Sequence, residues 1–89
     1  MSNTDPNADE INLANAECAA AYADDVITIE RRMGKVVDEG RTHKARAVRL
    51  RRAGDTRRAG YADRHVAQLR CDYRRLRTEL HELIEWAGR

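Results

Sequence analysis

Residues 66–87, VAQLRCDYRRLRTELHELIEWA, repeat an apolar side chain at alternating intervals of three and four residues. The repeated positions are Val66, Leu69, Tyr73, Leu76, Leu80, Leu83 and Ala87. This spacing gathers the side chains on one stripe of an α-helix, as in a coiled-coil seam. Ala59 and Ala62 continue the frame toward the N-terminus. The stretch therefore predicts a long helix that packs against another helix.

A second helix is predicted from about Pro6 to Asp38, because the same alternation returns there. Its stripe consists of Ala19, Tyr22, Val26, Ile29, Met33 and Val36. Asp5 is suited to cap the free N–H groups before Pro6, a residue that favours the first helical position. Gly40 offers the left-handed conformation that ends helices, and Thr42 offers a cap for the next helix. A short connection near Gly40 predicts antiparallel helices.

The segment after Thr42 leaves two arrangements open, because Gly54 and Gly60 interrupt it and each costs a helix about 1 kcal/mol relative to alanine. Either the chain breaks into helices at residues 42–53 and 57–87, with Asp55 or Thr56 as the cap, or one helix runs from 42 to 87. In both cases we expect an all-α fold. It is a long antiparallel helical hairpin of two or three helices, with a coiled-coil C-terminal seam, in a dimeric helical bundle.

The composition allows one small domain with a thin core. The 89 residues include no Phe and one Trp, and a chain of this length buries only about 60 to 65 per cent of its unfolded surface. We expect a disordered tail at residues 1–5, one helical domain at residues 6–89, and self-association to increase burial. The polar start and the absence of an apolar stretch of about 18 residues predict a cytoplasmic protein without membrane contact.

Charges are segregated along the chain. Residues 1–40 hold nine acids and three bases, residues 41–77 hold thirteen bases and three acids, and residues 78–89 hold three acids and one base. Either the acidic helix neutralises the basic stretch, or a basic surface remains for an anionic partner. A turn near Gly40 would bring opposite charges together across the hairpin. The matched pairs are Asp9 with Arg70, Glu30 with Arg49 and Asp25 with Arg58.

The same turn would leave the last heptads of the C-terminal helix without an intramolecular partner, and exposed apolar clusters usually mark an interface. The predicted dimer or partner interface is Leu69, Tyr73, Leu76, Leu80, Leu83, Ile84 and Trp86. We expect a homodimer, and a protein partner with an apolar groove and an acidic surface. The alternative is that a break near Gly54 lets the last helix slide back and bury this surface.

Nucleic-acid binding is the competing function. A basic stretch followed by Leu69, Leu76 and Leu83 resembles the basic-leucine-zipper family in outline, but residues 41–65 lack the asparagine that reads bases in that family. Phosphate contact by the stretch from Arg41 to Arg58 remains open. The residues of this predicted basic patch are Arg46, Arg49, Arg51, Arg52, Arg57 and Arg58.

Catalysis is not expected, because His43, His65 and His81 are scattered and no metal-ligand or phosphate-loop motif is present. No cofactor is implied. Cys18 and Cys71 are predicted to be reduced and partly buried. The sequence predicts a small helical interaction module that binds and modulates a larger protein, with inhibition favoured over activation. Small helical proteins of this style often serve bacteriophages or mobile elements as modulators of host machinery.

Overall fold

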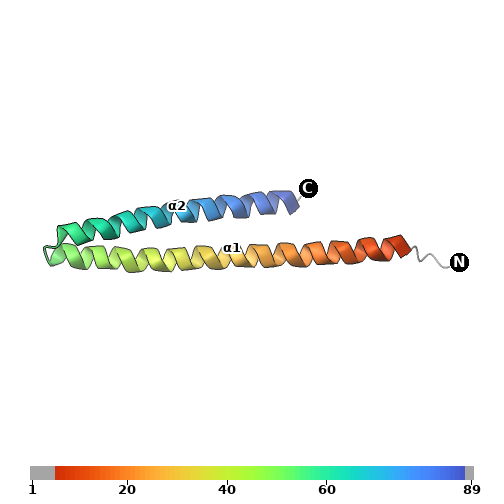
Figure 1. Cartoon of the computed structure of the whole chain (residues 1–89), viewed down its shortest axis with the longest axis horizontal. Coiled ribbons are helices and arrows are strands. Elements are labelled where there is room, and N and C mark those ends of the chain that lie inside the picture. Colours follow the sequence, from red (N-terminus) through yellow and green to blue (C-terminus); the bar gives the residue numbers. More distant parts are fainter. Residues whose placement is uncertain (1–5, 88–89) are drawn as a thin grey trace.

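Two long helices joined by a short turn make up the fold. The computed structural model describes the backbone of residues 6–87, and the side chains of residue 13 and residues 15–87. Helix α1 spans Pro6–Arg52 and helix α2 spans Thr56–Ala87. They lie side by side and antiparallel in a rod of 83 × 17 × 12 Å, as Figure 1 shows. The predicted all-α antiparallel hairpin is confirmed, with two helices.

Helix α1 begins at Pro6, as predicted. The two other expectations for the N-terminus, the cap at Asp5 and the disordered tail at residues 1–5, lie outside the described residues.

Helix α1 ends at a glycine in a left-handed conformation. Gly54 has a φ of 82°, which is strained for residues that carry a Cβ. The Gly54 N–H donates to the Arg51 carbonyl at 3.0 Å. The Asp55 N–H donates to the Leu50 carbonyl at 2.8 Å. These two bonds form a Schellman motif, which satisfies carbonyl groups at a helix end.

Helix α2 begins in the same turn. The Oδ1 atom of Asp55 accepts a hydrogen bond from the Arg58 N–H at 3.1 Å, and this is the geometry of an N-cap. Of the two arrangements left open by the sequence, the break at Gly54 with Asp55 as the cap is confirmed. The continuous helix over residues 42–87 is wrong.

Gly40, the predicted site of the turn, lies inside α1. The Thr42 hydroxyl, predicted to cap a new helix, donates instead to the Asp38 carbonyl one turn back, at 3.0 Å. A glycine inside a helix costs only about 1 kcal/mol relative to alanine, and the heptad frame continues past Gly40 to Ala47 and Leu50. The predicted turn near Gly40 is therefore wrong, because packing along the rest of α1 outweighs the cost of one glycine.

The helices meet along a seam that continues both heptad frames, from Tyr22 to Leu50 on α1 and from Ala59 to Leu83 on α2. Its buried residues are Ala47, Ala59, Ala62, Leu69 and Leu76. The alanines lie near the turn and the leucines lie farther along the seam. The two helices are closest together near the turn (Figure 1), and small side chains allow this approach. Neither helix, over its described length, is apolar enough to cross a membrane.

Helix α1 extends beyond the end of α2. It has 47 residues against 32 in α2, and Figure 1 shows its N-terminal part continuing past the C-terminus of α2. The last turns of α2 lie beside the middle of α1, because Trp86 lines a hollow with Asp25 and Ile29. The predicted C-terminal overhang is therefore wrong. A turn at Gly54 shifts α2 along α1 and leaves the N-terminal part of α1 unpaired.

Candidate interaction groove

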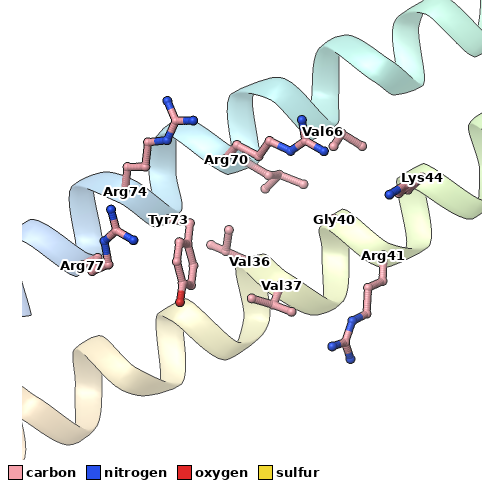
Figure 2. Close-up of a pocket in the computed structure, with 11 residues that line it drawn as sticks. Val36, Val37, Gly40, Arg41, Lys44, Val66, Arg70, Tyr73, Arg74 and Arg77 are labelled. Atoms are coloured by element: carbon pink, nitrogen blue, oxygen red, sulfur yellow. The ribbon is translucent and has the colours of Figure 1, made fainter.

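A groove of about 350 Å³ runs along one side of the seam, between α1 and α2. Its apolar floor is formed by Val36, Val37, Gly40, Val66, Leu69 and Tyr73. Its rim is formed by five cationic residues, Arg41, Lys44, Arg70, Arg74 and Arg77. These eleven residues are called the basic groove below (Figure 2).

The heptad frame explains why apolar and cationic residues meet in the basic groove. Val37 and Lys44 each follow a seam residue of α1, and Arg70 and Arg77 each follow a seam residue of α2, so all four flank the same side of the seam. Figure 2 shows the Tyr73 ring turned toward α1 beside the valines of the floor. The floor is open at its centre, because a Cβ added at residue 40 would meet nothing within 4 Å.

The charge of the basic groove has one sign. No carboxylate lines it. None of its five cations forms an ion pair with another described residue. Helix α2 contributes three of them, Arg70, Arg74 and Arg77, at intervals of one turn. An apolar floor under unneutralised cations is suited to an anionic ligand that also carries an apolar face.

The residues predicted to form an interface differ in how far the hairpin buries them. Leu69 and Leu76 are buried against α1. Tyr73, Leu80 and Leu83 are half-buried. Ile84 is 49% exposed and Trp86 is 66% exposed. The break near Gly54 therefore buries most of this surface within the chain, as the alternative interpretation expected, and a role for Ile84 and Trp86 in binding stays a prediction.

The predicted basic patch lies at the closed end of the hairpin. Its residues are Arg46, Arg49, Arg51, Arg52, Arg57 and Arg58, and all six are exposed. Arg51 forms an ion pair with Asp63, and the Nε atom of Arg58 lies 3.5 Å from the Oδ2 atom of Asp55. Arg57 also donates to the Tyr61 hydroxyl at 3.2 Å. The patch thus comes together in space, with part of its charge balanced locally.

The acidic N-terminal part of α1 does not cover this patch, because it lies at the opposite end of the hairpin (Figure 1). Asp25, predicted to pair with Arg58, instead lines the hollow near Trp86. Arg58 lies beside His43 near the turn. The predicted pairs of Asp25 with Arg58 and of Glu30 with Arg49 are wrong, because the turn at Gly54 sets a different register and places Glu30 and Arg49 on the same helix. The predicted pair of Asp9 with Arg70 involves a side chain that lies outside the described residues. The cross-helix ion pair in the described part of the chain is Arg51 with Asp63.

Two histidines that are far apart in the sequence lie together. The rings of His43 and His65 stack, with centroids 4.0 Å apart and planes at 24°. The sequence interpretation missed this pair because it assumed a turn near Gly40. Among the described residues, no group of three or more His, Cys, Asp or Glu side chains could hold a metal ion. Cys18 and Cys71 are free, as predicted, but they are exposed and not partly buried.

The basic groove itself was missed as well. A signal for it exists in the sequence, since the frame of α1 continues from Val36 through Gly40 to His43 and Ala47 at intervals of four, three and four. Combined with the turn at Gly54, that frame places residues 36–44 opposite residues 66–73 of α2. Two of these seam residues are a glycine and a histidine, and neither residue type is typical of a helix core.

A scan against protein-family models finds no match, and searches of curated proteins and of solved structures find none either. The class of the protein is therefore defined by its own structure. It is an extended two-helix hairpin with an open basic groove along the seam.

Proposed function

We propose that this chain is a small helical interaction module whose basic groove binds an acidic, apolar-faced helix of a partner protein. The observation that carries the proposal is the combination of an apolar floor with five cations that have no intramolecular partner among the described residues. Burial of the floor supplies affinity, and the cations steer the encounter and fix the register.

A helix is the favoured ligand because the basic groove lies between two long helices, α1 and α2. Helices dock in such grooves through apolar residues spaced three and four apart. The groove edge continues toward the open end at Ile84, which stands one heptad beyond Arg77 and is 49% exposed. Occupancy would withdraw the bound helix from its own contacts, and this is how the module would inhibit a larger protein.

A second candidate function is phosphate contact by the arginines at the closed end. The supporting observation is that these exposed side chains are not covered by the acidic part of α1, which lies at the other end of the hairpin. Arginines need only reach backbone oxygens to bind nucleic acid without reading its sequence. Such binding would weaken steeply as salt is raised.

The test is affinity capture from lysate with and without nuclease, using three forms of the protein. The groove variant carries Lys44→Glu and Arg74→Glu. The matched control carries Arg46→Glu and Arg49→Glu, which make the same change in net charge outside the groove.

Retention of one protein after nuclease by wild type and control, with its loss from the groove variant, supports the proposal. Loss after nuclease, or loss in the control variant alone, overturns it in favour of the nucleic-acid candidate. Retention by all three forms also overturns it, because the groove would then be irrelevant.

A further inference from the structure

The hairpin leaves more surface exposed than a chain of its mass normally does. Its accessible surface is 7450 Å². A compact monomer of 10.2 kDa would expose about 5300 Å². The excess, about 2100 Å² in one copy, is larger than the area of about 800 Å² that each partner contributes to a stable interface. The hairpin therefore has ample surface for a second copy to cover.

The N-terminal half of α1 is acidic, and its described side chains ahead of Tyr22 have no packing partner on α2, whereas residues 22–30 contact only the last turns of α2. Residues 13–30 contain Glu17, Asp24, Asp25 and Glu30 and no base, and the first basic residue of the chain is Arg31. The described side chains ahead of Tyr22 are all exposed, and Leu13 is 62% exposed. A single helix extending into water is only marginally stable. This segment thus has both the charge and the need for packing that the basic groove can satisfy.

We infer that two copies pack antiparallel along α1, so that residues 13–30 of each copy lie in the basic groove of the other. This inference rests on the proposed role of the groove and names the acidic helix that occupies it while no partner protein is bound. Each copy contributes one groove and one acidic segment, so a twofold arrangement pairs every groove and closes the assembly. The product is an antiparallel four-helix bundle.

One register accommodates the exposed apolar residues of α1. The large apolar side chains of α1 that are exposed within its described part are Leu13, Ile27 and Val48. They fall on one stripe, because they are separated by two and three heptads. Placing Ile27 of one copy against Gly34 of the other brings Leu13 against Val48. Gly34 leaves space for the isoleucine, since an added Cβ there would meet nothing within 4 Å.

The same register pairs opposite charges. It places Glu17 of one copy against Lys44 of the other, and Glu30 against Arg31, by counting positions along the two antiparallel helices. Asp24 falls alongside the part of the groove rimmed by Arg70 and Arg74. Apolar fit and charge complementarity thus select one alignment.

A charge-swap series tests the inference by sedimentation equilibrium. The groove variant is Lys44→Glu with Arg74→Glu, and the segment variant is Glu17→Lys with Asp24→Lys. Each alone should weaken dimerisation at least about tenfold at about 50 mM salt, because the contacts of Glu17 with Lys44 and of Asp24 with Arg74 then join like charges. An equimolar mixture of the two should restore a dimer, as should one chain carrying all four changes. Restoration shows that the variants still fold.

Disulfide trapping tests the register in a background with Cys18→Ser and Cys71→Ser. Ile27→Cys with Gly34→Cys should give a covalent dimer on oxidation. The two positions are one heptad apart on one helix, about 10 Å, so a bond within one chain is excluded because Cα atoms must approach within about 7 Å. The matched control, Thr28→Cys with Lys35→Cys, has the same spacing on another face of α1 and should stay uncrosslinked.

A monomeric wild type at hundreds of micromolar overturns the inference, and so does a dimer that the groove variant forms as tightly as wild type or that mixing fails to restore. Equal crosslinking of both cysteine pairs also overturns it. A failure of this inference can be distinguished from a failure of the proposed function, which the capture experiment tests separately. A monomer that still retains an acidic protein through its groove would refute the second copy as occupant and leave the proposed function intact.

Discussion

Alanine substitution at Gly40 and Gly54 should change stability in opposite directions. At Gly54 the φ of 82° forces an L-residue into a conformation that costs about 1–2 kcal/mol. The smaller entropy of the unfolded alanine chain returns about 0.4–1 kcal/mol. Gly54→Ala should therefore lower the free energy of unfolding by about 1 kcal/mol.

At Gly40 an alanine would meet neither backbone strain nor a steric clash. The residue is helical, and a Cβ there would meet nothing within 4 Å. Alanine is favoured over glycine inside a helix by about 0.8–1 kcal/mol. Gly40→Ala should raise the free energy of unfolding by that amount. The two sites are far apart, so the double variant should unfold close to wild type.

The assay is urea unfolding followed by far-ultraviolet circular dichroism, at a protein concentration low enough to keep the chain monomeric. In thermal unfolding a change of about 1 kcal/mol corresponds to about 4–8 °C for a domain of this size. The opposite pattern would refute the reasoning. If Gly40→Ala destabilises the protein and Gly54→Ala does not, the chain reverses at Gly40 and the seam described above does not exist.

Four further substitutions test the hairpin by the same unfolding measurements. Leu69→Ala should lower the free energy of unfolding by about 2–3 kcal/mol, because the side chain is 7% exposed and its removal leaves a cavity in the seam. Leu13→Ala, at an exposed site, should change that free energy by less than about 0.5 kcal/mol. Equal losses at the two sites would contradict the packing of Leu69 against α1. Arg51→Ala should cost under about 1 kcal/mol and lose that effect at high salt, since the ion pair with Asp63 is solvent-exposed; a larger, salt-insensitive cost would contradict this. Asp55→Ala should cost about 1 kcal/mol through loss of the cap on α2, and an unchanged midpoint would show that the cap is dispensable.

The two helices and their packing against each other could be predicted from the sequence, because hydrophobic periodicity is a local property. The alternation from Val66 to Leu83 specifies an apolar stripe whatever the rest of the chain does, and the structure places that stripe against α1. The antiparallel direction also followed, since any short connection gives it. The capping role of Asp55 was one of two open choices, and its hydrogen bond to Arg58 decides it.

The site of reversal could not be read in the same way. Gly40 and Gly54 are both plausible helix ends by local chemistry, and each costs about the same inside a helix. The choice depends on how much seam each turn allows the two helices to bury, which is a sum over contacts between residues far apart in the sequence. That sum favours Gly54, because the frame of α1 runs on through Ala47 and Leu50.

The sequence by itself determined two long amphipathic helices and a chain whose acids and bases are separated. Only the tertiary structure decided which of those charges face one another. Moving the turn from Gly40 to Gly54 shifts α2 along α1, separates the acidic part of α1 from the arginines, and assembles the basic groove from residues 36–44 and 66–77. The physical reason is that periodicity fixes the face a residue occupies, whereas register fixes its neighbours, and register is set by packing over the whole seam.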